Sequence, residues 1–375
     1  MTETMPAATF KTSYGDEIRL DSGYASSLAK SVRGDTPQQL FEVQYKTAAP
    51  PLPLGQFAYK HYEACMVYDA VRKAGLPLRF ESMLDIGSGF AAMPRITWVR
   101  NYARDVTALD LFPYGVTALT NGRTRRMLAA VAMAQRTGLK NLRGPMGKWE
   151  WVVAKENFRL PPPTSNGRFD YKVANIYEIE GNHDWINSSL TLTHFNHRDL
   201  FPKIADLLAD GGIFTFTVEC WWYPINSTQI SGAAPYMCQR LTRDDLLRYF
   251  REVQSDVDVE KVASVYDYYA DPSHPTASEY IATAVANDMH PIIVERHMNA
   301  RSRGRRAAVP PPYLVREFET GAAHALDNIK RFKPEVLLED LYTSHYLLGF
   351  IKVARGGANG SCGAGKPSPA RLGGA

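Results

Sequence analysis

The stretch that decides the fold is "ESMLDIGSGFAAMPRITWVR", residues 81–100. An apolar run ends at Ile86, Gly87-Ser88-Gly89 follows, and the pattern then becomes that of a helix. Glycines directly after a buried strand let the backbone approach a ligand and adopt dihedral angles that a Cβ atom would forbid. The helix that follows directs its free N–H groups at the same place. The pattern therefore predicts a nucleotide-binding turn between a strand and a helix.

A second strand, in "TALDLF", residues 107–112, helps to decide which nucleotide the turn binds. Its Asp110 follows the glycines at the usual distance of about 20 residues, where a carboxylate accepts hydrogen bonds from both ribose hydroxyls. Gly87, Gly89 and Ala92 also satisfy a loose dinucleotide fingerprint, in which Ala replaces the third Gly. These features fit both NAD and S-adenosylmethionine.

Three further features favour S-adenosylmethionine over NAD. Asp85 lies two residues before Gly87, at a position that NAD-binding folds usually keep apolar, and it suits a ligand with an ammonium group. Ala92 is a weak match for the third glycine of a pyrophosphate-binding turn. The segment "LLADGGIFTFTVE", residues 207–219, predicts a helix, a double-glycine turn and an apolar strand.

With these motifs the chain resembles class I S-adenosylmethionine-dependent methyltransferases over residues 59–219. The match of "LDIGSGFA" to the family's first motif implies that Asp85, Gly87 and Gly89 line the methionine part of the donor. The match of "ALDLF" to the second motif implies that Asp110 holds the ribose, with Leu111 beside it. The stretch "AKENFRLPPPTSNGRFDYKVANIYE" resembles the adenine-side segment and the fourth strand. The contacts that it implies are Glu156 or Asn157 to the adenine, and Asn175 near the sulfonium.

The alternation of helical and strand patterns predicts an α/β protein with a parallel sheet. The resemblance implies a Rossmann-like, seven-stranded, mostly parallel sheet with helices on both faces, whose last strand is antiparallel. "YLLGFIKVA", residues 346–354, is the candidate for that strand. The expected units are an N-terminal segment or lid (1–58), the donor-binding core (59–224), acceptor-binding additions with closing strands (225–355) and a disordered tail (356–375). The N-terminal and C-terminal additions are expected to form a substrate cap.

Methyl transfer to a hydroxyl group requires a base at the carboxyl ends of the fourth and fifth strands. "FDYKVANIY", residues 169–177, is taken as the fourth strand, and the histidine-rich segment 177–199 follows it. The candidate catalytic residues are His183 first, His194 second, and Glu219 at the end of the fifth strand. The run Trp221, Trp222 and Tyr223 predicts either an aromatic wall for the acceptor or a core aromatic cluster.

A metal ion is not expected at this site. His194 and His197 have the i,i+3 spacing of two metal ligands on a helix, with Asp184 or Glu180 nearby. The carboxylate cluster of metal-dependent catechol-type methyltransferases is, however, not apparent in the sequence.

The acceptor is expected to be a small hydroxylated metabolite or a sugar unit. The alternative of an RNA or DNA substrate comes from five arginines between Arg296 and Arg306, which could contact phosphates. The Asn/Asp-Pro-Pro-aromatic motif of amino-methylating DNA enzymes does not follow the presumed fourth strand, where the chain has "NIYE". A third hypothesis is a relative that binds the donor without catalysis.

Composition limits the other classes of function. The chain has 375 residues, 45% of them hydrophobic, and a formal net charge of +4, so no strong global attraction to nucleic acid follows. No apolar run approaches the roughly 20 residues that span a bilayer, and no membrane partner is expected. The four cysteines show no paired spacing and are expected to be reduced thiols in a cytoplasmic protein without a zinc site.

Overall fold

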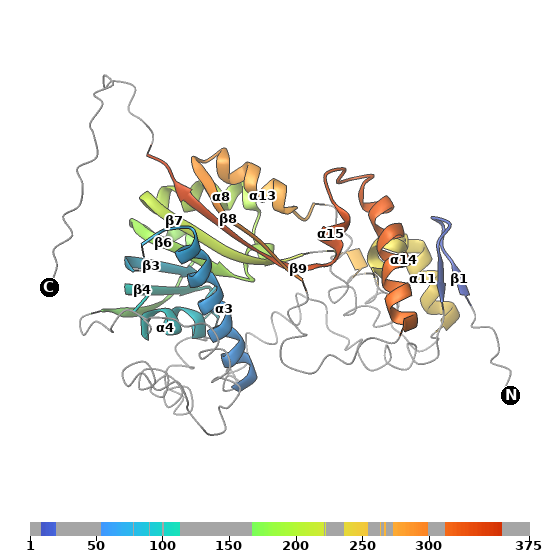
Figure 1. Ribbon diagram of the computed structural model, residues 1–375, viewed down its shortest axis with the longest axis horizontal. Helices are drawn as coiled ribbons and strands as arrows, with labels where there is room; N and C mark the ends of the chain where they lie inside the picture. Colours follow the sequence, from blue (N-terminus) through green and yellow to red (C-terminus); the bar gives the residue numbers. More distant parts are fainter. Residues whose placement is uncertain are drawn as a thin grey trace, which may run out of the picture.

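A seven-stranded sheet forms the larger part of the structure, a computed structural model (Figure 1). The structure describes residues 9–19, 54–77, 79–89, 91–99, 101–112, 167–220, 222, 236–253, 263, 266–267, 273–298 and 312–354. The strands, in the order in which they lie across the sheet, are β5 (Phe169–Val173), β4 (Ala103–Asp110), β3 (Phe80–Ile86), β6 (His183–Ser189), β7 (Leu208–Glu219), β9 (Thr343–Lys352) and β8 (Met289–Met298).

The direction of the strands confirms the predicted Rossmann-like fold. The five strands from β5 to β7 are mutually parallel, whereas β9 runs antiparallel to both β7 and β8. The segment expected to close the sheet is β9, inserted between β7 and β8. The carboxyl ends of the parallel strands therefore share one edge, where ligands of open α/β sheets bind.

One strand assignment made from the sequence is wrong. The segment taken as the fourth strand is β5, which lies at the edge of the sheet beside β4. The strand that follows β3 toward β7 is β6, which the sequence pattern did not reveal. Its centre carries Asn187 and Ser188, two polar residues that are fully buried, so it lacks the apolar run of a central strand. The pattern "WEWVVA", residues 149–154, also predicts a strand, but these residues lie outside the described ones.

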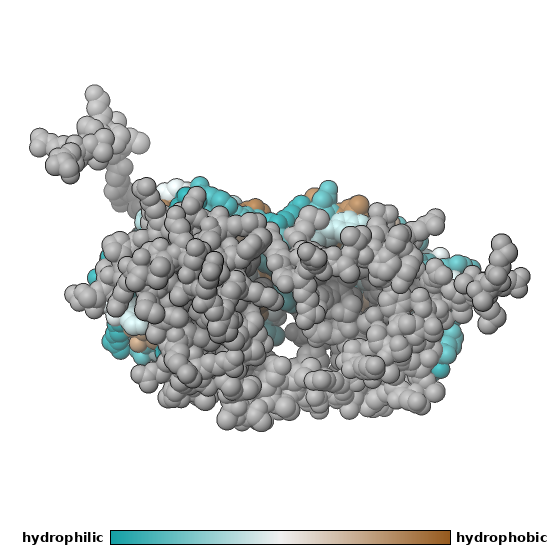
Figure 2. Space-filling model, turned by 60° about the horizontal axis from the view of Figure 1, so that its bottom comes forward, coloured by the Kyte–Doolittle hydropathy of each residue, from teal (hydrophilic) through white to brown (hydrophobic). Residues whose placement is uncertain are grey.

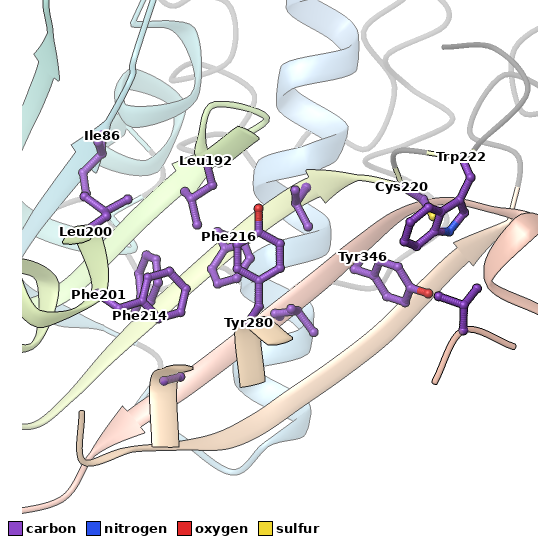
Figure 3. Close-up of a cluster of buried hydrophobic side chains, with 14 of the residues drawn as sticks. Ile86, Leu192, Leu200, Phe201, Phe214, Phe216, Cys220, Trp222, Tyr280 and Tyr346 are labelled. Atoms are coloured by element: carbon purple, nitrogen blue, oxygen red, sulfur yellow. The ribbon is translucent and has the colours of Figure 1, made fainter. Parts of the chain in front are cut away.

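Helices cover both faces of the sheet (Figure 1). On one face lie α3 (Leu54–Lys73) and α4 (Ala92–Val99), and on the other lie α8 (His197–Leu207) and α13 (Ala277–Val285). Alternation along β7 sends Phe214 and Phe216 toward Phe201 of α8 and Tyr280 of α13, as Figure 3 shows. Ile213, one residue before Phe214, faces the opposite side of the sheet and belongs to the separate cluster under α3 and α4.

A second body lies beside the sheet and brings a hairpin near the N-terminus together with helices from the second half of the chain (Figure 1). It contains a hairpin of β1 (Thr9–Lys11) and β2 (Glu17–Arg19), followed by the helices α10 (Met237–Arg240), α11 (Arg243–Val253), α14 (Pro312–Ile329) and α15 (Leu338–Leu341). The backbone N–H of Ser13 in the hairpin turn donates to Asp245 Oδ2 of α11 at 2.8 Å. A capping box begins α11, because the Asp245 N–H donates to Thr242 Oγ1 at 3.0 Å and the Thr242 N–H donates to Asp245 Oδ2 at 3.3 Å.

A buried ion pair fixes the hairpin to the helices. Arg240 of α10 and Asp16 of the hairpin turn are 0% and 1% exposed, and Arg240 Nε donates to Asp16 Oδ2 at 2.5 Å. His324 Nε2 of α14 lies 3.4 Å from the other Asp16 oxygen. The carboxylate thus connects three segments that are far apart in the sequence.

Where described residues reach the surface in Figure 2, most are hydrophilic and the hydrophobic ones are scattered. Among the described helices, none is at once long and apolar enough to cross a membrane.

We expect Asp16→Asn to lower the free energy of unfolding by about 3–5 kcal/mol, because the buried Arg240 charge loses its counterion. The exposed pair Arg243–Asp267 offers a matched control, since both of its side chains are 52% exposed. Asp267→Asn should cost less than about 1 kcal/mol. Urea unfolding followed by circular dichroism measures both values, and equal costs for the two variants would contradict a structural role of the buried pair.

Candidate functional site

The glycine turn lies at the carboxyl end of β3 and has the strained backbone that the sequence predicts. Gly87 and Gly89 have φ values of +66° and +51°, which disfavour residues with a Cβ atom. A Cβ on Gly87 would lie 2.2 Å from Thr191 Cγ2, whereas one on Gly89 would meet no described atom within 4 Å. Gly87 is therefore pressed against the chain that leaves β6, whereas no described atom would contact a Cβ on Gly89.

Ser88 ties the turn to the ends of two strands. Its hydroxyl donates to the Asp85 carboxylate at 2.8 Å and accepts from the Leu109 N–H of β4 at 3.1 Å. Its backbone N–H donates to the Leu109 carbonyl at 3.0 Å. The loop is thereby held rigidly between β3 and β4.

Asp110 closes the other side of the turn. Its two carboxylate oxygens accept from the backbone N–H of Gly89 at 2.7 Å and of Phe112 at 3.0 Å. Burial raises the pKa of Asp110, and these backbone hydrogen bonds offset part of the rise. Because each carboxylate oxygen has a further lone pair, the group can still accept hydrogen bonds from a ligand. Leu111, next to it, exposes 52% of its surface at the same edge.

Asp85 is the buried counterpart of Asp110, only 2% exposed. Besides the bond from Ser88, its Oδ1 accepts from Asn187 Nδ2 of β6 at 2.6 Å. The two carboxyl groups thus lie on either side of Gly87–Gly89, as the sequence predicts. One is buried below the turn and the other lies at its rim.

The predicted place of His183 is wrong. His183 is the first residue of β6, and β6 runs parallel to β3, so His183 lies at the amino edge of the sheet. Six residues of strand, about 20 Å, separate it from the carboxyl end beside Gly87. Burial lowers its pKa, and the nearby Lys172 acts in the same direction. The error follows from taking β5 for the fourth strand.

His194 and Glu219 do lie at the carboxyl edge. His194 belongs to the single turn η2 (Leu192–His194), directly after β6, and its side chain is exposed. Neighbouring protein atoms nevertheless displace enough water to lower its pKa. Glu219 is the last residue of β7 and is paired in register with His345 of β9.

Asn175 lies at this edge, but not where the sequence placed it. It follows β5, so it is on the Asp110 side of the turn, and its predicted position near the fourth strand is wrong. Its side chain accepts from the Tyr177 N–H at 3.2 Å and caps the turn η1 (Ile176–Glu178). The predicted adenine contacts Glu156 and Asn157 lie outside the described residues.

Trp222 belongs to a core cluster, which was the alternative to an aromatic wall. It is 7% exposed and packs near Cys220 and Tyr346, as Figure 3 shows. Trp221 and Tyr223 lie outside the described residues, as do the other four arginines of the cluster, Arg301, Arg303, Arg305 and Arg306. Arg296 itself pairs with Asp340, at 3.2 Å.

Two polar residues of this region escaped the sequence analysis. Glu63 of α3 is 1% exposed and accepts hydrogen bonds from the hydroxyls of Ser189 and Thr217, at the ends of β6 and β7. Asn187 links β6 to Asp85. The sequence could have revealed Glu63 as a single acidic residue among the apolar residues of "YEACMVY". Asn187 could have been noticed likewise, as a polar residue within a strand.

The described residues contain no group of three or more His, Cys, Asp or Glu side chains that could hold a metal ion. His197, considered as a partner for His194, is 9% exposed and packs against the Tyr280 ring at 5.4 Å.

Comparison with known proteins finds solved structures of low sequence identity. No family model and no curated protein matches the chain. Solved structures that resemble it include the geranyl diphosphate C-methyltransferase of Streptomyces coelicolor, with 11% identity over 93% of this chain and 92% of that one and a TM-score of 0.38. The cyclopropane synthase MmaA2 of Mycobacterium tuberculosis has 12% identity over 77% and 83% of the two chains, with a TM-score of 0.35.

The phosphoethanolamine N-methyltransferase 2 of Haemonchus contortus has 13% identity and a TM-score of 0.38. The match covers 77% of this chain but only 52% of that protein, so this chain spans about half its length. The order and direction of the strands in this chain are those of a Rossmann-like sheet. A likeness at this level does not identify the reaction, which has to be inferred from the residues of this chain.

The two glycines of the turn give a matched pair of variants. Gly89→Ala should lower the free energy of unfolding by about 1–2 kcal/mol, the cost of a left-handed conformation for a residue with a Cβ atom. Gly87→Ala should cost at least about 1–3 kcal/mol more, because its methyl group also overlaps Thr191. Urea unfolding of the two variants measures the difference. Equal costs would show that Thr191 does not press on Gly87.

Proposed function

We propose that the protein is an S-adenosylmethionine-dependent methyltransferase that methylates a hydroxyl group of a small molecule, either a metabolite or a sugar. The observation that carries the proposal is the placement of Asp85 and Asp110 on either side of the Gly87–Gly89 turn. The donor has an ammonium group at one end and a ribose diol in its middle, and both are hydrogen-bond donors. Two carboxyl groups at this spacing complement that pair of features.

The same placement disfavours a dinucleotide. A pyrophosphate on the glycine turn would lie close to the Asp85 carboxylate, and like charges in a partly buried site repel. In the proposed complex, Asp110 accepts from the ribose hydroxyls and the exposed Leu111 packs against the neighbouring base. Gly89 leaves room for the backbone to approach the ligand, which fits the open space next to it.

The donor supplies an activated methyl group, so the protein has to orient the acceptor, exclude water and remove a proton. His194 is the proposed base, because it follows β6 directly at the carboxyl edge and remains accessible. Glu219, at the end of β7, is the second candidate. The second body lies beyond the carboxyl end of β7 (Figure 1). This position supports its proposed role as the cap over the acceptor.

Donor binding is tested by calorimetry. S-adenosylmethionine and S-adenosylhomocysteine should bind, and NAD and NADP should not. Asp110→Ala should weaken binding by about 1.5–3 kcal/mol, the scale of hydrogen bonds to a charged group. Tight NADP binding without a response to either sulfur ligand would overturn the proposal.

The affinity for the donor should also depend on pH. Ribose hydroxyls need the ionised carboxylate, and burial raises the pKa of Asp110. Affinity should therefore be complete near neutral pH and decline on acidification, starting above the usual aspartate value of about 3.9. Asp110→Asn cannot titrate, so its weaker affinity should lose this component of the pH dependence. An identical profile in the variant would assign the titration to another group.

His194→Ala should keep the donor affinity of the wild type and lower turnover by about 10²–10⁴-fold, the usual contribution of a positioned base. Turnover is measured as transfer from isotopically labelled donor to small-molecule fractions. The wild-type rate should rise through a titration below the usual imidazole value of about 6.5, because the pKa of His194 is lowered. His183→Ala, at the opposite edge of the sheet, is the control and should remain active. Normal turnover in His194→Ala would favour Glu219.

A further inference from the structure

A chain of hydrogen bonds crosses three strands and ends at Asp85. Trp185 Nε1 of β6 donates to Thr215 Oγ1 of β7 at 2.7 Å, and Thr215 Oγ1 donates to Asn187 Oδ1 at 2.9 Å. Asn187 Nδ2 then donates to Asp85 Oδ1 of β3 at 2.6 Å. Trp185, Thr215 and Asn187 are 0% exposed and Asp85 is 2% exposed, so bulk water does not interrupt the chain.

The indole sets the direction of every bond in this chain. An indole N–H can only donate, so Thr215 Oγ1 must use a lone pair for Trp185. The hydroxyl hydrogen is then free for Asn187, whose amide must turn its oxygen toward Thr215. That orientation points the NH₂ group of Asn187 at Asp85 Oδ1, with Met93 Sδ 3.6 Å away as a second acceptor.

The opposite orientation of these hydrogen bonds is energetically unfavourable. If the Asn187 amide flipped, its oxygen would face Asp85 Oδ1 at 2.6 Å, and two acceptors at that distance repel unless Asp85 carries a proton. Thr215 would then receive two N–H donors and would have to turn its own hydrogen elsewhere. Among the described residues, Trp185 and Asn187 are the hydrogen-bonding partners of the Thr215 hydroxyl.

The register of the strands places the members of this hydrogen-bond chain next to one another. Asp85, Asn187 and Thr215 are direct neighbours across β3, β6 and β7, so their side chains leave the same face in one row. Trp185 lies two residues before Asn187 and therefore on that face as well. The residues that fix Asp85 thus come from strands that do not contribute to the glycine turn.

We propose that Trp185, Thr215 and Asn187 are positioning residues that hold Asp85 in its ionised form, oriented toward the ammonium group of the donor. The other carboxylate oxygen lies 2.8 Å from the Ser88 hydroxyl, which divides its one hydrogen between this oxygen and the Asp85 carbonyl, so both carboxylate oxygens face donors. Asp85 then acts as a fixed negative charge, and proton transfer belongs to other residues. This inference rests on the proposed function, because it assumes a cationic group on the ligand.

The test compares two variants that break the chain at different bonds. Thr215→Val keeps the shape of the side chain but removes the hydroxyl, and Trp185→Phe removes the indole donor that sets the direction. Both should bind S-adenosylhomocysteine about 3- to 10-fold more weakly near neutral pH, the value of one net hydrogen bond. The loss of affinity on acidification, which in the wild type is that of Asp110, should begin at higher pH in both variants, because Asp85 then accepts a proton as well.

Two further variants separate this effect from a general loss of packing. Thr215→Ser retains the hydroxyl and should restore both the affinity and the pH profile. Thr217→Val removes a buried hydroxyl two residues along the same face of β7, where the partner is Glu63, and should leave the pH profile of donor binding unchanged. Calorimetry from about pH 5 to 8 gives the profiles, spanning the range in which imidazoles and raised carboxylates titrate. Urea unfolding confirms that each variant is folded.

The outcomes distinguish this proposal from the proposed function. Wild-type protein that binds neither sulfur ligand would overturn both. If the wild type binds these ligands but folded Thr215→Val and Trp185→Phe show the wild-type pH profile, the positioning role of the hydrogen-bond chain is overturned. The methyltransferase proposal would still stand. A shift that Thr217→Val reproduces to the same extent would also overturn the positioning role, since the effect would then be one of packing.

Discussion

The site depends on the burial of one carboxyl group, that of Asp85, at the end of a central strand. A carboxyl group removed from water is costly unless donors surround it. Here the donors come from the turn itself, through Ser88, and from the neighbouring strand, through Asn187. Satisfying Asp85 therefore requires that β3 and β6 be paired in a single register, with the glycine turn closed over their ends.

The need to satisfy Asp85 also constrains side chains on β6 and β7. Asn187 can serve Asp85 only if its amide is turned the right way, and Thr215 and Trp185 determine that orientation. Gly87 can close over the strand end only because it lacks the Cβ atom that Thr191 would exclude. The polar row and the tight turn are thus two parts of one arrangement, in which β3, β6 and β7 hold a rigid platform.

The second body is held together by a different principle. Asp16, Arg240 and His324 come from the beginning, the middle and the end of the chain, and they meet around one carboxylate. Such a pair adds little net stability, but it penalises any arrangement that separates its members. The body also shares its apolar core with the sheet, since one cluster runs from Phe10 to Phe350. A cap built in this way would keep a fixed position relative to the carboxyl edge of β7.

The sequence by itself determined the features that depend on neighbouring residues. The turn at Gly87–Gly89, the carboxylates Asp85 and Asp110 around it, and the closing strand β9 could all be predicted, because glycine conformation, residue spacing and alternation are local properties. The order of the strands is not local. Only the tertiary structure showed that residues 169–173 form an edge strand. His183 therefore lies at the amino edge of the sheet, away from the glycine turn, and His194 lies at the carboxyl edge. Glu63, Asn187 and Thr215 escaped notice for the same reason, since a buried polar residue has meaning only through partners about 30 to 150 residues away, which only packing brings together.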